Sequence, residues 1–122
     1  MEKNKPFSLR ARVRSFRYAF EGLKNFISIE HNAWLHLIAT VAVIILAIIT
    51  NVSKLEWIAL VIVIGSVWVA ELFNTAVEKI MDFISIEQNP EIKIIKDLSA
   101  AAVLVAAITA FITGCFIFIP KL

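Results

Sequence analysis

Two long stretches without a charged side chain constrain this chain more than any other feature. No Asp, Glu, Lys or Arg occurs in residues 31–53 or 98–120, and a third such run, 57–70, ends at Glu71. The hydrocarbon core of a bilayer is about 30 Å thick and is crossed by roughly 20 apolar helical residues. The first and last runs meet that length directly, and the middle run meets it if its helix begins near Lys54. We therefore expect three membrane-spanning helices.

The composition agrees with a membrane protein. Of the 122 residues, 60% are hydrophobic and 18% are charged, whereas average chains are roughly 45–50% apolar and about 25% charged. Because a small soluble domain leaves a large share of its residues in water, these values exclude an ordinary soluble monomer. The three glycines are widely scattered, which excludes a Gly-rich phosphate loop. No region alternates as a strand would, so the expected class is an all-α membrane protein.

Local signals place the helix limits. Ser53 and Glu56 have the spacing of a capping box. Asn89 and Pro90 have the order of an N-cap followed by a proline at the first helical position. We predict one domain, 1–122, with spans at 31–52, 54–86 and 90–120. The second helix would be roughly 50 Å long at about 1.5 Å per residue, so it would extend beyond the membrane into the cytoplasm.

The segment 1–30 differs from the spans. Its apolar residues recur at spacings of three and four, and its basic residues are Lys3, Lys5, Arg10, Arg12, Arg14, Arg17 and Lys24. This pattern predicts an amphipathic helix on an anionic membrane surface; the alternative is a helix that packs on a partner. Most Lys and Arg residues fall on the side of the N-terminus, which is therefore predicted to be cytoplasmic. The net charge of +2 hides this asymmetry, so it does not indicate a nucleic-acid partner, and none is expected.

The predicted second span carries a polar stripe. Glu71, Asn74, Thr75, Glu78 and Asp82 fall on one face of a helix. Ionisable groups at membrane depth usually face a protein interior or a functional cavity. The alternative, a helix end that emerges into water, explains Asp82 well but Glu71 and Asn74 poorly.

Other acidic residues fall at the same predicted interface. Glu30 lies just before the first span and Asp97 just before the third, so both gather with Glu71 and Glu78 on the cytoplasmic side. Mg²⁺ prefers oxygen ligands, often carboxylates together with substrate phosphates. A nucleotide from the cytoplasm and a lipid hydroxyl from the bilayer would meet there, which suits phosphoryl transfer.

Several motifs resemble those of the prokaryotic diacylglycerol kinase family. The run from Glu71 to Asp82, ELFNTAVEKIMD, resembles the signature E-x-x-N-[ST]-[SA]-x-E-x-x-x-D. Lys96-Asp97 followed by Ser-Ala-Ala-Ala-Val-Leu at 99–104 resembles a second block. Phe-Arg-Tyr-Ala at 16–19 with Gly22, and Glu30-x-Asn32-x-x-x-His36, resemble the N-terminal part. The resemblance covers nearly the whole chain.

This resemblance implies an ATP- and Mg²⁺-dependent lipid kinase of the bacterial inner (plasma) membrane. The family is a homotrimeric bundle of three transmembrane helices per chain plus the surface helix, with active sites shared between subunits. By motif position, Glu71 is the general base with Asn74 beside it, Glu71 and Ala100 contact the lipid, and Glu30 and Glu78 hold the metal. The residues implied for nucleotide binding are Tyr18, Glu87, Lys96 and Asp97, with Arg12 or Arg14.

Some alternatives stay open. The acceptor is diacylglycerol, giving phosphatidic acid, or undecaprenol, which the Glu30-x-Asn32-x-x-x-His36 pattern of the Gram-positive branch favours. Trp34 and Asn89 stand where relatives often carry a basic residue and a histidine. His36 is either a polar anchor or a site residue near the lipid. Remoter functions are a small membrane transporter, because a membrane glutamate can carry protons or cations, and a non-catalytic membrane scaffold.

Overall fold

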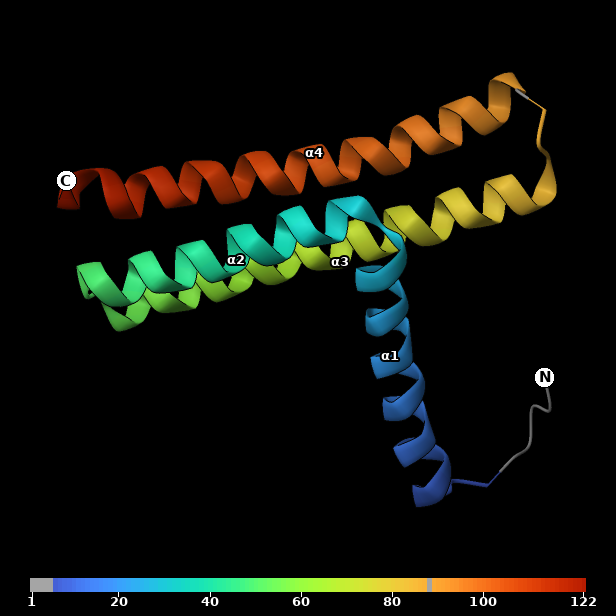
Figure 1. Cartoon of the computed structure of the whole chain (residues 1–122), viewed down its shortest axis with the longest axis horizontal. Helices are drawn as coiled ribbons and strands as arrows, with labels where there is room; N and C mark the ends of the chain where they lie inside the picture. The colour runs from blue at the N-terminus through green and yellow to red at the C-terminus, as the bar shows by residue number, and fades with distance from the viewer. Residues whose placement is uncertain (1–5, 88) are drawn as a thin grey trace. The chain divides into compact units, whose positions relative to one another are not determined.

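All regular secondary structure in the described part of the chain, residues 6–87 and 89–122, is helical. The computed structural model contains α1 (Leu9–Ile29), α2 (His31–Thr50), α3 (Lys54–Ile84) and α4 (Pro90–Phe118), followed by the short 3₁₀ helix η1 (Ile119–Lys121) (Figure 1). Three segments are long and apolar enough to cross a membrane, namely His31–Thr50, Lys54–Ile84 and Pro90–Lys121. The expectation of an all-helical chain with three candidate spans is confirmed.

Helix α1 belongs to the first of two compact units, which ends at Leu35; the second is His36–Leu122. The Ser8 side chain accepts a hydrogen bond from the Ala11 N–H at 3.4 Å and so caps the start of α1. The Glu30 N–H donates to the Phe26 carbonyl at 3.0 Å where α1 ends. Lys3 and Lys5, which the sequence placed in the surface helix, lie outside the described residues.

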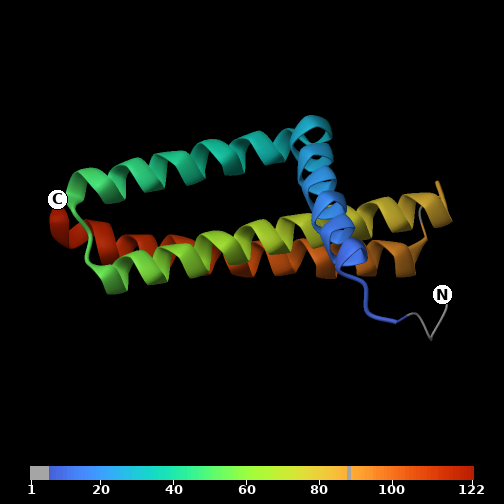
Figure 2. The same cartoon turned by 90° about the horizontal axis from the view of Figure 1, so that it is seen from below.

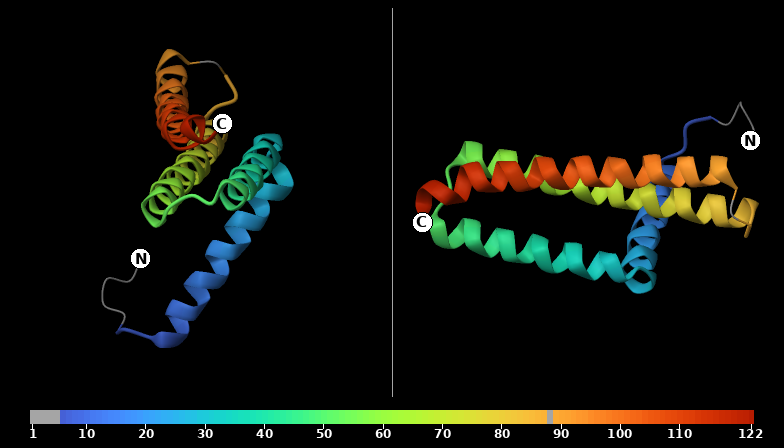
Figure 3. Two further views of the ribbon diagram at one scale, coloured as in Figure 1. Left: turned by 90° about the vertical axis from the view of Figure 1, so that its left-hand side faces the viewer. Right: turned by 90° about the horizontal axis from the view of Figure 1, so that it is seen from above.

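Within the second unit, α3 and α4 run antiparallel and side by side, as Figure 2 and the right-hand panel of Figure 3 show. These two helices make the closest backbone contacts between helices of the unit. Helix α2 runs alongside α3 (Figure 1). The long α3 therefore contacts both other helices, and it carries the predicted acidic stripe.

The turn between α2 and α3 follows from a few local residues. Asn51 has a positive φ of 54°, a conformation that asparagine tolerates better than most residues. The Asn51 N–H donates to the Ile48 carbonyl and the Val52 N–H to the Ala47 carbonyl, both at 3.2 Å. This is the Schellman pattern, which satisfies the last carbonyls of a helix. It ends α2 at Thr50, two residues before the predicted limit of the span.

The predicted starts of α3 and α4 are confirmed. The Glu56 N–H donates to Ser53 Oγ at 3.1 Å and the Ser53 N–H to Glu56 Oε1 at 2.8 Å, which completes a capping box. Asn89 Oδ1 accepts from the Glu91 N–H at 2.9 Å, with Pro90 at the first helical position. Helix α3 ends at Ile84 rather than at the predicted 86, because the next backbone residue, Ser85, is already extended.

The buried apolar core of the second unit lies where the α2–α3 turn meets the end of the chain. Ala47, Val52, Leu60 and Ile117 form this cluster. An ion pair of 3.1 Å joins Lys121 Nζ to Glu56 Oε2 nearby. Most other large apolar side chains of the three long helices are exposed. Exposed apolar surface of this extent marks contact with lipid or with other protein chains.

Candidate active site

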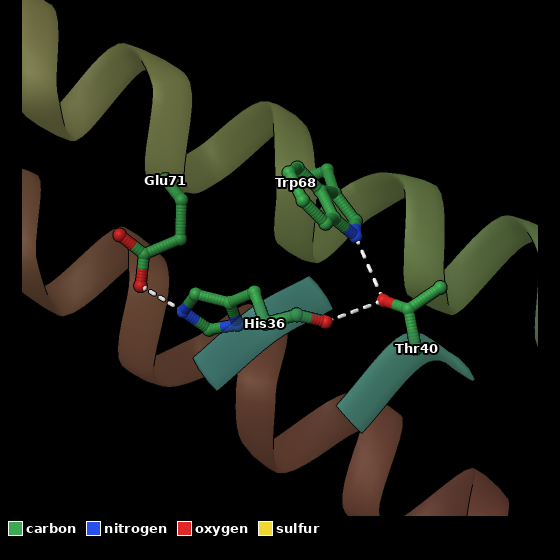
Figure 4. Close-up of polar contacts among 4 residues, drawn as sticks. All are labelled: His36, Thr40, Trp68 and Glu71. Carbon is green, nitrogen blue, oxygen red and sulfur yellow. Dashed lines mark hydrogen bonds and ion pairs between the residues drawn. The ribbon is translucent and has the colours of Figure 1, made fainter. Parts of the chain in front are cut away.

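Glu71 is the one charged side chain that is buried among the described residues, with an exposed fraction of 6%. Its carboxylate lies on α3 and faces His36 of α2, with 2.6 Å between Glu71 Oε1 and His36 Nε2 (Figure 4). An ionised carboxylate only accepts hydrogen bonds, so His36 donates through Nε2 whenever Glu71 is ionised. The pair therefore places a charge-assisted hydrogen bond between two apolar helices.

A second pair of polar contacts holds the histidine. Thr40, one turn further along α2, donates from Oγ1 to the His36 carbonyl at 2.7 Å. Trp68 of α3 donates from Nε1 to Thr40 Oγ1 at 2.9 Å (Figure 4). The Trp68 and His36 rings also meet edge to face, with centroids 6.5 Å apart. Sequence reasoning missed Thr40 and Trp68, although each lies within one turn of His36 or Glu71 on its own helix.

The second carboxylate oxygen of Glu71, Oε2, makes no hydrogen bond or ion pair with a described residue. In Figure 4 it points away from His36. No non-exposed side chain of the described residues has a fully buried oxygen or nitrogen without a hydrogen-bond partner, so an unbonded Glu71 Oε2 must reach accessible space. A cavity of about 190 Å³ is lined by His36, Thr40 and Trp68 together with Ala107 and other apolar residues. Three of the four residues in Figure 4, all but Glu71, thus line a mainly apolar cavity.

The acidic stripe of α3 changes in exposure along the helix. Glu71 is buried, Asn74 and Glu78 are half-buried, and Asp82 is exposed. Asn74 Oδ1 accepts from Ser99 Oγ of α4 at 2.8 Å, which fixes the amide beside Glu71. The sequence did not single out Ser99 as a partner of Asn74, although Ser99 lies only two residues after the predicted site residue Asp97. Glu78 makes no hydrogen bond or ion pair with any described residue.

The C-terminal end of α3 and the N-terminal end of α4 enclose a second cavity of about 430 Å³. Lys96 Nζ lies 2.6 Å from Asp82 Oδ1, and Lys93 Nζ lies 2.6 Å from Asp97 Oδ2. These four residues line the cavity with Ser85, Ile86, Glu87, Asn89, Pro90 and Ile92. The structure therefore brings together three residues that the resemblance implied for nucleotide binding, namely Glu87, Lys96 and Asp97. Ala100 is exposed on α4, one turn beyond Lys96.

The remaining predicted site residues belong to the first unit. Tyr18 is exposed on α1, and Glu30 is half-buried where α1 ends. Within residues 6–87 and 89–122, no group of three or more His, Cys, Asp or Glu side chains is arranged to hold a metal ion.

Comparisons with known proteins show the family of the chain. Residues 17–118 match the family described as prokaryotic diacylglycerol kinase. The undecaprenol kinase of Bacillus subtilis is 37% identical over 109 residues, which cover 89% of each chain. The diacylglycerol kinase of a Synechocystis species is 36% identical over 88% of this chain, which spans 62% of that relative. The chain therefore belongs to the prokaryotic diacylglycerol kinase family and is a multi-pass membrane lipid kinase.

Proposed function

We propose that the chain transfers the γ-phosphoryl group of ATP to the hydroxyl of a membrane lipid alcohol, with Glu71 as the general base. The observation that carries this proposal is the buried Glu71 carboxylate, which is held on one oxygen by His36 and open on the other. A carboxylate within reach of a hydroxyl accepts its proton as the oxygen becomes a nucleophile. Its depth in an apolar helix suits an acceptor that stays in the bilayer.

The reaction conserves atoms and charge in a single displacement. The lipid oxygen forms a bond to the γ-phosphorus of ATP, the bond from that phosphorus to the bridging oxygen breaks, and ADP leaves. The hydroxyl proton moves to Glu71. Asn74, fixed by Ser99 at 2.8 Å, would orient the reacting groups one turn from the base. Positioning of this kind supplies most of the rate in phosphoryl transfer.

The carboxylates of Glu78 and Glu30 fit the Mg²⁺ that such a reaction uses. The Glu78 side chain is half-buried and has no hydrogen-bond or ion-pair partner among the described residues, so its carboxylate is available to a cation. Carboxylate oxygens are ligands that Mg²⁺ accepts together with phosphates. When bound, the ion would neutralise the phosphate charge that builds up during transfer. Glu30 belongs to the first unit, so we infer that the two ligands meet in the assembled protein.

The 430 Å³ cavity at the ends of α3 and α4 is the proposed nucleotide site. Lys96 supplies a cation for the phosphates, and its present partner, Asp82, is an exposed side chain that an incoming anion can replace. Surface ion pairs of this type contribute only about 0–1 kcal/mol, so the exchange costs little. Glu87 and Asp97 line the same cavity, and Tyr18 with Arg12 or Arg14 would complete it from α1.

We further propose a homotrimer in a bacterial plasma membrane, with the N-terminus cytoplasmic and α1 on the inner membrane surface. The exposed apolar side chains of α2, α3 and α4 support contact with lipid and with other subunits. Val13, Phe16 and Phe20 of α1 are also exposed, which supports insertion of its apolar face into the interface. Sharing of sites between subunits would explain why one short chain presents its metal ligands in separate units.

Two lipid alcohols are candidates for the acceptor. Undecaprenol is favoured, because the relative named undecaprenol kinase matches this chain over 89% of both lengths. Diacylglycerol is the second candidate, since the relative named diacylglycerol kinase is nearly as similar in sequence, although this chain spans only 62% of it. Both molecules present a primary hydroxyl at the membrane interface, so Glu71 would act on either in the same way.

A competition assay tests this proposal. The purified full-length chain, reconstituted in vesicles that contain equal amounts of undecaprenol and diacylglycerol, is given Mg²⁺ and ATP labelled in the γ-phosphate. We expect label in a lipid phosphate, with undecaprenyl phosphate exceeding phosphatidic acid. Predominant labelling of phosphatidic acid would reverse the acceptor assignment. No labelling of either lipid, with ATP intact, would contradict the proposed reaction and favour a transporter or a scaffold.

A further inference from the structure

We propose that His36 is a positioning residue for the general base: its Nε2–H holds Glu71 Oε1, so that Oε2 alone receives the proton of the lipid hydroxyl. This inference rests on the proposed function of Glu71. It adds a role for a residue of α2, whereas the proposed machinery otherwise comes from α1, α3, α4 and the loop between α3 and α4.

The geometry of the pair carries the inference. Glu71 is 6% exposed, and a carboxylate this buried is costly to keep ionised without a donor. His36 Nε2, at 2.6 Å, is the one hydrogen-bond or ion-pair partner of Glu71 among the described residues. No described Lys or Arg side chain pairs with it. His36 Nε2 is therefore the described group that holds the Glu71 carboxylate in place.

The histidine is itself held in place from two helices. Thr40 Oγ1 donates to the His36 carbonyl and accepts from Trp68 Nε1, so α2 is tied to α3 one turn from the base. The Trp68 ring also lies against the imidazole edge to face. The Thr40 bond is made to the His36 backbone, and the Trp68 ring is the contact that restricts the imidazole and, through it, the carboxylate. Figure 4 shows the result, with one carboxylate oxygen bound and the other directed away.

This arrangement predicts a specific kinetic effect. Without the donor, the Glu71 carboxylate rotates and its oxygens exchange, so fewer complexes have the base aligned with the hydroxyl. Hydrogen bonds to charged groups contribute about 1.5–3 kcal/mol, which corresponds to a fall in kcat of about 10- to 100-fold. His36 touches neither ATP nor the phosphoryl group in this account, so the KM values for ATP and for lipid change little.

Three variants test the proposal in vesicles with Mg·ATP and undecaprenol. His36→Leu keeps the size and loses the donor, and His36→Gln places an amide N–H near the position of Nε2. His31→Leu is the matched control, because it makes the same change at the other histidine, which is exposed. We expect kcat to fall about 10- to 100-fold in His36→Leu, to recover mostly in His36→Gln, and to stay unchanged in His31→Leu.

The outcomes separate this inference from the proposed function. A wild-type chain that phosphorylates neither undecaprenol nor diacylglycerol would contradict the lipid kinase proposal itself. An active wild type with full kcat in His36→Leu, or with KM changed in place of kcat, would overturn the role of His36. Nitrogen-15 spectra of the wild type and of Glu71→Leu give a test that needs no His36 variant. We expect the Nε2–H resonance of His36 to shift in Glu71→Leu, and an unchanged resonance would also overturn the proposal.

Discussion

The two ends of the α2–α3–α4 bundle use the same helices in different ways. At one end, Ala47, Leu60 and Ile117 pack into an apolar cluster under the α2–α3 turn. At the other, α3 carries the buried Glu71, the bonded Asn74 and the unpaired Glu78. The apolar end satisfies its polar groups by local capping, whereas the polar end leaves a carboxylate oxygen open and Glu78 without a partner.

From this difference we expect the apolar end to determine the stability of the bundle and the polar end to carry the chemistry. The contacts of the apolar end are complete within one chain, so they hold the helices in register. The polar end has a carboxylate without a partner and a cavity of about 430 Å³, features that a ligand completes. Ionisable groups at membrane depth usually face a protein interior or a functional cavity. Changes at the two ends should therefore affect different measurements.

Apart from the base Glu71, the largest effect is expected from loss of the Glu78 carboxylate. Because Glu78 is proposed as a metal ligand, Glu78→Gln should lower kinase activity by at least about 100-fold. Residues that only hydrogen-bond to a metal ligand typically contribute about 10- to 100-fold. The thermal stability of the variant should stay near that of the wild type. Activity titrated against Mg²⁺ measures the effect, with Glu91→Gln at an exposed helix start as the control. Equal Mg²⁺ dependence of both variants would contradict the role.

A cavity at the apolar end should affect stability alone. Leu60 is 2% exposed in the cluster, so Leu60→Ala leaves a void that costs about 2 kcal/mol. This value is at the low end for such changes, because helix association in a bilayer lacks the hydrophobic driving force of water. Unfolding in mixed micelles measures it, and the exposed Leu55→Ala is the control. A fall in kcat of the folded Leu60→Ala protein would contradict the expectation that the apolar end affects stability alone.

The smallest effect is expected at the bond that fixes Asn74. Ser99→Ala removes a donor 2.8 Å from Asn74 Oδ1, and a neutral hydrogen bond contributes about 1 kcal/mol. We expect a fall in kcat of about 5- to 10-fold, with Ser99→Thr retaining the hydroxyl and most of the activity. Steady-state rates at saturating ATP measure it. If Ser99→Ala matches the wild type while Asn74→Ala is inactive, the amide needs no support from α4.

Sequence predicted the local features and the family, but not the partners across helices. The capping box at Ser53 and the N-cap at Asn89 depend on residues within one turn, so spacing alone identified them. The burial of Glu71 agrees with a stripe that begins at membrane depth. By contrast, the partners of Glu71 and Asn74 come from other helices, and the sequence does not give the rotation that pairs them. The roles of Glu30 and Tyr18 stay predictions.

One matched pair of variants tests the central claim, that chemistry belongs to the polar end of the bundle. Glu71→Gln and Glu56→Gln make the same change near the middle and at the start of α3. Glutamine can replace glutamate in a capping box. The measurement is transfer of labelled phosphate from Mg·ATP to lipid by the reconstituted protein. The account predicts a loss of about 10²- to 10⁴-fold in Glu71→Gln and wild-type activity in Glu56→Gln. Full activity in Glu71→Gln, or equal loss in both variants, would contradict it.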